Sequence, residues 1–159
     1  MAKLSSDAKK ALSNMKLDPV LIEKIDKTEA CEAFIKMLNE LVEKKEKDFV
    51  LQFDEKGFNG GKASISPDGT TITVNIGKNF GETYGQIALL TTIVHEVTHA
   101  TQFLPGAKYT VDESLIAQYT LSEYALLRNQ MEGEAIYNEF LVLQALSDAN
   151  AYERACVAG

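Results

Sequence analysis

The two histidines of this chain, His95 and His99, lie four residues apart in a segment that is otherwise nearly uncharged. At helical spacing, residues i and i+4 lie on one face a turn apart, so both imidazoles can reach one metal ion. The preceding residues 86–94 are apolar on nearly every side, which is typical of a helix that passes through a core. The spacing therefore predicts a metal site on a buried helix. The alternative is a pair of buried histidines satisfied by hydrogen bonds alone.

Glu96 follows the first histidine directly and completes the pattern His-Glu-x-x-His over residues 95–99. A shuffled chain of this composition would contain it roughly once in a thousand sequences, so chance is a poor explanation. The carboxylate lies beside the two imidazoles and can act as a base on the ion's water. A purely structural metal site has no need of such a base, so the pattern favours a catalytic one.

Two histidines leave a tetrahedral zinc ion in need of a third protein ligand, which here must be Asp, Glu or Cys. Glu132 is the preferred candidate, because Ala135 shares its helix face and would allow a close approach of the histidine helix. Glu134 lies about 200° around the helix from Glu132, so only one of the two can be a ligand. Glu139, on the same face as Glu132, and Glu123 remain alternatives.

The alternative interpretation of the segment around Glu132 is a solvated acidic helix face. In that case Arg128 would form an i,i+4 ion pair with Glu132. Asp112 is close to the histidines in sequence but is expected to cap a helix. Cys31 and Cys156 lie far apart and are expected to be free thiols, with a cysteine ligand only a minor possibility.

The two motifs together resemble the gluzincin branch of zinc peptidases. Residues 94–102 and the segment Arg128-x-x-x-Glu132-Gly133-Glu134-Ala135 are similar to a group of small bacterial metallopeptidases whose second motif reads approximately Arg-x-x-Glu-Ala-Asp-Ala. The resemblance covers about residues 86–146. It implies that His95, His99 and Glu132 bind Zn²⁺ and that Glu96 is the catalytic base.

Two positions depart from that motif. Gly133 replaces a small alanine, which weakens the helix at this point. Glu134 replaces an aspartate, so a longer carboxylate would have to make any contact to a histidine.

The remaining sequence predicts an α+β fold in one domain, residues 1–159. The first quarter is predicted to be helical, with one helix starting at Asp18-Pro19. Three segments rich in β-branched residues predict a small antiparallel sheet with a hairpin: 49–53, 63–65 and 71–76. The histidine helix follows and ends near residue 103. Capping boxes at Thr110–Glu113 and Thr120–Glu123 predict a short helix and then a long one to about residue 146. This order is the minimal layout of a zincin.

A peptide or protein substrate is expected to bind as an added strand beside the histidine helix, with 71–76 as the predicted edge strand. The alternative is that 71–76 is an interior strand. Tyr109, in the loop after that helix, and Arg128, one turn before Glu132, are the candidates for stabilising the oxyanion. The competing functional hypothesis is a non-catalytic zinc domain that regulates or binds a partner. The sequence makes no prediction about oligomeric state.

Composition narrows the class of partner. The formal net charge of −7 argues against nucleic acid, because binding a polyanion requires clustered Lys and Arg. No segment has the length of a membrane span or the pattern of a secretory signal, so a cytoplasmic protein is expected, with secretion by a signal-less route left open.

Overall fold

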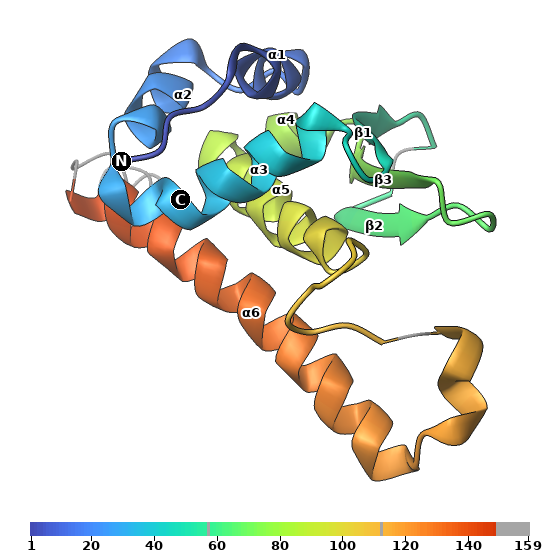
Figure 1. Cartoon of the computed structure of the whole chain (residues 1–159). Helices are drawn as coiled ribbons and strands as arrows, with labels where there is room; N and C mark the ends of the chain where they lie inside the picture. The colour runs from blue at the N-terminus through green and yellow to red at the C-terminus, as the bar shows by residue number, and fades with distance from the viewer. Residues whose placement is uncertain (57, 112, 149–159) are drawn as a thin grey trace.

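The computed structural model describes residues 1–56, 58–111 and 113–148 and confirms the α+β prediction (Figure 1). In chain order the elements are α1 (Ser6–Asn14), α2 (Pro19–Asp26), the 3-10 helix η1 (Glu29–Cys31), α3 (Glu32–Glu43), β1 (Asp48–Asp54), β2 (Gly61–Ile65), β3 (Thr71–Gly77), α4 (Phe80–Tyr84), α5 (Gln86–Thr101), the 3-10 helix η2 (Glu113–Gln118) and α6 (Leu121–Asp148).

The sheet has the strand order β1-β3-β2. The predicted hairpin is present: β2 and β3 are antiparallel, and the turn between them places Gly69 at a φ of 74°, where glycine is favoured. The prediction of an antiparallel sheet is wrong for β1, which pairs parallel to β3. After β1 the chain forms β2 at the opposite edge of the sheet, and it then returns as β3 between these two strands.

The predicted edge strand 71–76 is also wrong, because β3 is central and bonds to a strand on each side. Its side chains Ile72, Val74 and Ile76 are fully buried on the face toward the helices. The edge strands are β1 and β2, and β2 is the one that lies against α5. The edge beside the histidine helix is therefore β2.

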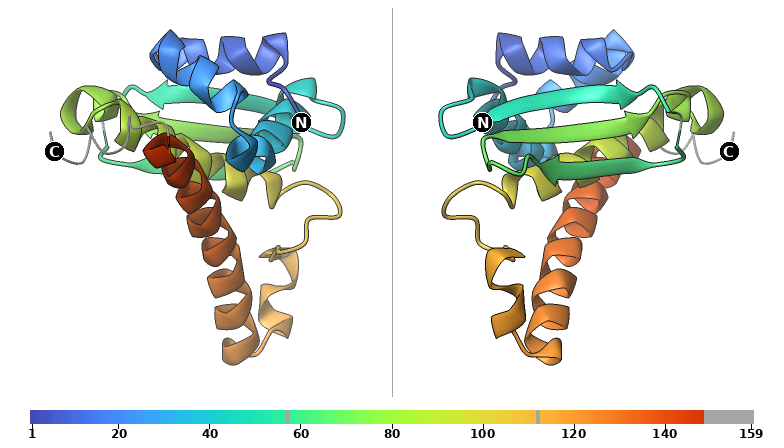
Figure 2. Two further views of the ribbon diagram at one scale, coloured as in Figure 1. Left: turned by 90° about the vertical axis from the view of Figure 1, so that its left-hand side faces the viewer. Right: turned by 90° about the vertical axis from the view of Figure 1, so that its right-hand side faces the viewer.

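Helix α5 is the centre of the molecule, with β2 and β3 on one side and α6 on the other. In Figure 2 the sheet, α5 and α6 follow one another as successive layers. The helix begins at Gln86, because Gly85 adopts a φ of 92° and separates it from the short α4. Burial on both sides explains the nearly continuous apolar sequence before the histidines.

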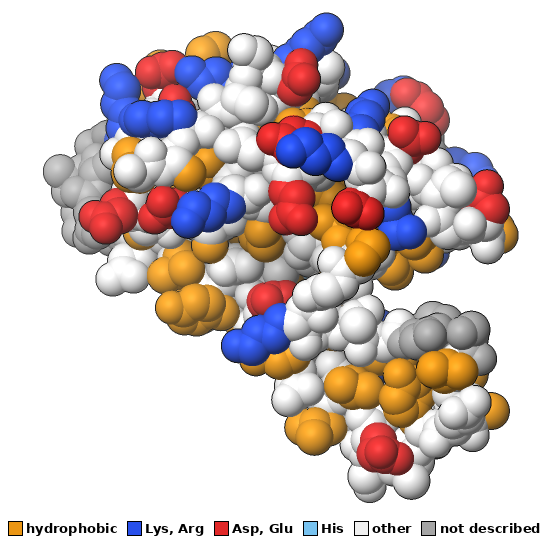
Figure 3. All heavy atoms as spheres, in the orientation of Figure 1, with side chains coloured by type: hydrophobic (Ala, Val, Ile, Leu, Met, Phe, Trp, Pro, Cys, Tyr) orange, Lys and Arg blue, Asp and Glu red, His pale blue; other side chains and the backbone are white. Residues whose placement is uncertain are grey.

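Helix α6 is 28 residues long, and it packs on the body of the molecule from Met131 onward. The part of α6 before Met131 extends away with η2 beside it (Figures 1 and 2). This arm carries exposed apolar side chains, among them Leu121 and Leu126. Figure 3 shows orange hydrophobic patches on the arm. The capping box at Thr120 is confirmed by reciprocal bonds with Glu123 of 2.9 and 3.1 Å. The other predicted box and Asp112 depend on side chains outside those described.

Cys31 is a free thiol whose burial raises its pKa to about 11. Cys156 lies outside the described residues. Among the helices that the structure describes, none has the length and apolar character needed to span a bilayer.

Gly133→Ala is expected to stabilise the protein, because Gly133 lies inside α6 and an added Cβ meets no atom within 4 Å. Glycine inside a helix costs roughly 0.5–1 kcal/mol relative to alanine. The midpoint of thermal unfolding should therefore rise by about 2–4 °C for a gain near 1 kcal/mol. Thermal unfolding followed by circular dichroism measures the change, and a lower midpoint would contradict it.

Candidate metal centre

Three side chains from two helices converge where α5 crosses α6. The Nε2 atoms of His95 and His99 lie 3.1 Å apart, and the two oxygens of Glu132 lie 2.7 Å from His95 Nε2 and 3.1 Å from His99 Nε2. These three residues could hold one metal ion, since their ligand atoms all lie within 4.8 Å of one another. The ion pair between Arg128 and Glu132, which belongs to the alternative interpretation, is not formed among the described residues, because Glu132 faces the histidines instead.

The other nitrogen of each imidazole is held by a different residue. Nδ1 of His95 lies 2.9 Å from Glu139 on α6, and Nδ1 of His99 lies 2.8 Å from the side-chain oxygen of Gln102, one turn further along α5. A carboxylate and an amide oxygen can only accept hydrogen bonds, so each Nδ1 must be the donor. A neutral imidazole then has its lone pair on Nε2, toward Glu132.

The centre of the cluster therefore brings together groups that can all only accept hydrogen bonds. Two Nε2 lone pairs and a carboxylate at these separations repel one another unless a cation lies among them. Burial lowers the pKa of His95, but the hydrogen bond and charge of Glu139, with the charges of Glu96 and Glu132, raise it overall. A metal ion would satisfy all three residues at once.

Glu96 is only 8% exposed and lies beside the cluster. Burial raises the pKa of its carboxyl group, and the two histidines oppose this in part. Within the described part of the chain its carboxylate makes no hydrogen bond, so it is free to accept one from a water molecule.

A cavity of about 330 Å³ opens onto these residues. Its walls are the start of β2, the histidine face of α5 and the facing part of α6, and its lining comprises Gly61, Lys62, Ala63, His95, Glu96, His99, Gln102, Phe103, Arg128, Met131 and Glu132. The candidate base and the three potential ligands thus share one solvent-accessible space.

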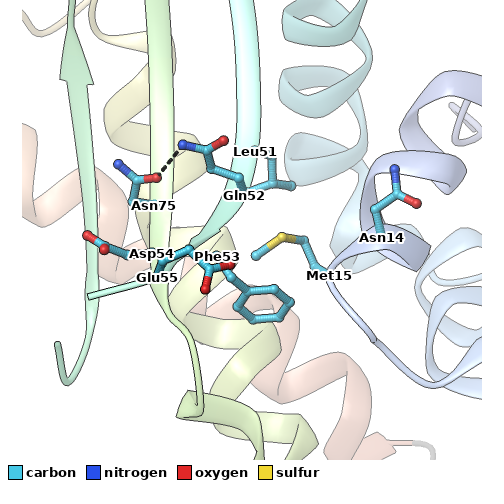
Figure 4. Close-up of a pocket in the computed structure, with 8 residues that line it drawn as sticks. All are labelled: Asn14, Met15, Leu51, Gln52, Phe53, Asp54, Glu55 and Asn75. Atoms are coloured by element: carbon cyan, nitrogen blue, oxygen red, sulfur yellow. Dashed lines mark hydrogen bonds between the residues drawn. The ribbon is translucent and has the colours of Figure 1, made fainter. Parts of the chain in front are cut away.

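A second cavity, of about 530 Å³, lies between β1 and the end of α1 (Figure 4). Its lining is mostly amide and apolar side chains, with Gln52 bonded to Asn75 at 2.9 Å and only Asp54 and Glu55 titratable. It contains no imidazole or thiol, so the smaller cavity is the better candidate for chemistry.

The predicted site residues fall into two groups. His95, Glu96, His99, Glu132 and Arg128 all line the smaller cavity. Tyr109 is not among the described residues that line it; the ammonium of Lys108 lies 5.2 Å from the centre of its ring.

The alternative ligands have other partners. Glu139 contacts His95 at Nδ1 rather than Nε2, and Glu123 caps α6. Glu134 accepts from Gln102 at 3.0 Å, so its link to His99 is indirect.

Several residues of the site were not identified from sequence. Asn138 is buried and donates to Thr98 at 3.1 Å, which joins α6 to α5, and Gln102 is 2% exposed. The structure describes five buried polar side chains, and all of them except Asp26 lie at this site: Glu96, Thr98, Gln102 and Asn138. Gln102 could have been found from its i+3 spacing to His99, whereas Asn138 has no comparable signal.

Gly61→Ala is expected to destabilise the protein, because an added Cβ would lie 2.7 Å from Glu96 Cγ and 3.0 Å from Thr92 and Ile76 side-chain carbons. Overpacking of this kind typically costs about 1–3 kcal/mol. Denaturant unfolding measures the loss, with Gly133→Ala as the control whose effect has the opposite sign. Unchanged stability would show that β2 and α5 separate easily.

No protein-family model matches this chain, and neither the curated proteins nor the solved structures compared with it gave a match. The geometry of the site itself therefore has to carry the functional conclusion.

Proposed function

We propose that this protein is a zinc-dependent peptidase. The observation that carries the proposal is the convergence of two imidazole nitrogens and one carboxylate on a single point, with a buried, unbonded glutamate beside them. Three protein ligands with a position left for water are typical of catalytic zinc sites.

The donor set fits zinc by distance as well as by type. Two nitrogens bound tetrahedrally at the usual Zn–N distance are about 3.3 Å apart. The Nε2 atoms here are 3.1 Å apart, so little movement is needed to accept the ion. Both imidazoles already direct an Nε2 lone pair to the common point, because Glu139 and Gln102 occupy the Nδ1 side.

The residues of the chain then have distinct chemical tasks. His95, His99 and Glu132 would hold the ion, which when bound lowers the pKa of its water toward neutrality and polarises the scissile carbonyl. Glu96 takes a proton from the attacking water and later delivers it to the leaving amine. Burial raises the pKa of its carboxyl group, which makes the carboxylate a stronger base than a free glutamate.

Edge strand β2 offers a place for the substrate backbone. Ser66 N donates to Thr71 O and Gly77 N to Gly60 O, so the even-numbered residues of this strand bond to β3. The backbone groups of Gly61, Ala63 and Ile65 therefore face outward, and Gly61 and Ala63 line the cavity. An extended peptide paired with them would pass beside the histidines.

Arg128 is the proposed oxyanion stabiliser. It lies one turn before Glu132 on α6 and lines the cavity, and the described residues form no ion pair with it. A free guanidinium there can stabilise negative charge that develops on the carbonyl oxygen. The position of Tyr109, away from the cavity lining, gives no support to the same role for that residue.

The direct test combines metal analysis with a substrate search. Protein purified without a metal-affinity tag is analysed for zinc by mass spectrometry and then incubated with a peptide mixture whose products are sequenced. The proposal expects about one zinc per chain and cleavage that stops with a chelator and returns with zinc. Zinc without cleavage would favour the alternative, a non-catalytic zinc domain, and absence of zinc would contradict both.

Glu132→Gln is expected to weaken zinc affinity by an order of magnitude or more, because it removes a charged ligand. Glu82→Gln is the matched control with the same change of charge, at an exposed position of α4 that does not line the cavity. It should have little effect on the zinc affinity. Competition with a chromogenic chelator gives both dissociation constants, and equal constants would show that Glu132 is not a ligand.

A further inference from the structure

Gln102 is a buried amide with every polar atom occupied. Its oxygen lies 2.8 Å from His99 Nδ1, and its nitrogen lies 2.9 Å from the backbone oxygen of Met131 and 3.0 Å from Glu134 Oε1. We propose that Gln102 is a positioning residue that selects the tautomer of His99, and that Glu134 fixes the orientation of Gln102. The inference rests on the proposed zinc site.

The orientation of the amide follows from its neighbours. Met131 O and a carboxylate oxygen of Glu134 can only accept hydrogen bonds, so the group between them must be the NH₂ of Gln102. The amide oxygen then has to face His99. A flipped amide would place its oxygen against two acceptors and its NH₂ against the Nδ1 proton of the imidazole.

This orientation decides a competition for one proton. Glu132 lies 3.1 Å from His99 Nε2 and, without a metal, attracts a proton to that nitrogen. The oxygen of Gln102 attracts the proton to Nδ1 instead, which leaves the Nε2 lone pair available for zinc. Without this acceptor, a neutral His99 would donate from Nε2 to Glu132, and that hydrogen bond would have to break before zinc could bind.

The two histidines are held by chemically different partners. His95 donates to a carboxylate, Glu139, whereas His99 donates to a neutral amide. A carboxylate accepts in any rotation, but an amide accepts at one end only, so Gln102 needs a second residue to orient it. Glu134 supplies this, and both it and Met131 flank the proposed ligand Glu132 on α6.

The experiment detects the tautomer directly. Long-range ¹H–¹⁵N spectra of the metal-free protein with neutral imidazoles distinguish Nδ1–H from Nε2–H, and chelator competition gives the zinc dissociation constant. We expect His99 in the unaltered protein to be the Nδ1–H form. Gln102→Leu should shift it toward Nε2–H and weaken zinc binding by about 10- to 100-fold.

An exchange of the two groups provides the rescue. Gln102→Glu alone places a carboxylate oxygen against two acceptors, Met131 O and Glu134. Gln102→Glu with Glu134→Gln keeps an acceptor for His99 and replaces the repulsion from Glu134 with a donor from position 134. The double variant should recover the Nδ1–H form and a zinc affinity closer to that of the unaltered protein than either Gln102→Leu or Gln102→Glu gives. Glu134→Leu alone removes the acceptor that orients Gln102, so it should shift the tautomer and the zinc affinity in the same direction as Gln102→Leu.

The Nδ1–H form in Gln102→Leu together with unaltered zinc affinity would overturn the proposal and leave Gln102 as a space-filling residue. If Gln102→Leu fails to fold, the double variant decides: failure to recover the Nδ1–H form in a folded protein overturns the proposal equally. Failure of the peptidase proposal can be distinguished from failure of this inference, because the tautomer of His99 can be measured in a protein that binds zinc but cleaves no peptide.

Discussion

Glu96→Gln is expected to abolish peptide hydrolysis while the fold and the bound zinc remain. The amide has the shape of the carboxylate and fits the same space beside Gly61, but it cannot accept a proton from the attacking water. General acid–base catalysis contributes about 10²–10⁴-fold, so kcat/KM should fall at least 100-fold. Hydrolysis of a peptide found in the substrate search, with zinc content determined on the same sample, measures both parts of the prediction.

Glu82→Gln is a suitable control for the change of charge, because Glu82 is exposed on α4 and does not line the cavity. It should cleave as fast as the unaltered protein. Equal cleavage by Glu96→Gln would show that Glu96 is not the base, and loss of zinc from that variant would show that the residue supports the metal centre rather than the reaction.

Local sequence patterns were sufficient to predict the three strands. The β-branched segments became β1, β2 and β3 with boundaries within two residues, because alternation and turn residues act over a few positions. They could not predict strand order. A central strand with one exposed face alternates just as an edge strand does, so residues 71–76 gave no sign that β3 would be paired on both sides.

The candidate site was likewise predictable only in part from local sequence. The spacing of His95 and His99 fixes their relative position within one helix, so this pair followed from sequence. The partners of their Nδ1 atoms depend on how α6 is rotated and displaced against α5, which no local pattern encodes. Glu139 was considered only as an alternative ligand, although the structure places it behind His95, and Gln102 was not considered.

His95→Ala is expected to remove most of the zinc. The change takes away one of three proposed ligands and leaves Glu139 without the imidazole to which it is bonded at 2.9 Å. Two remaining ligands hold zinc weakly against water, so the content should fall from about one ion per chain to a small fraction. Mass spectrometry on untagged protein gives the stoichiometry, and full retention of metal would refute a shared site.

Thermal unfolding with and without a chelator separates loss of metal from loss of fold. A ligand that binds only the folded state adds about 2.7 kcal/mol at a concentration 100 times its dissociation constant, so chelation should lower the unfolding midpoint of the unaltered protein by several degrees. His95→Ala should unfold cooperatively at a midpoint that the chelator does not change. Glu139→Gln keeps an acceptor near His95 Nδ1. The chelator should lower its unfolding midpoint by less than in the unaltered protein but by more than in His95→Ala, because the change weakens the support of a ligand without removing the ligand itself.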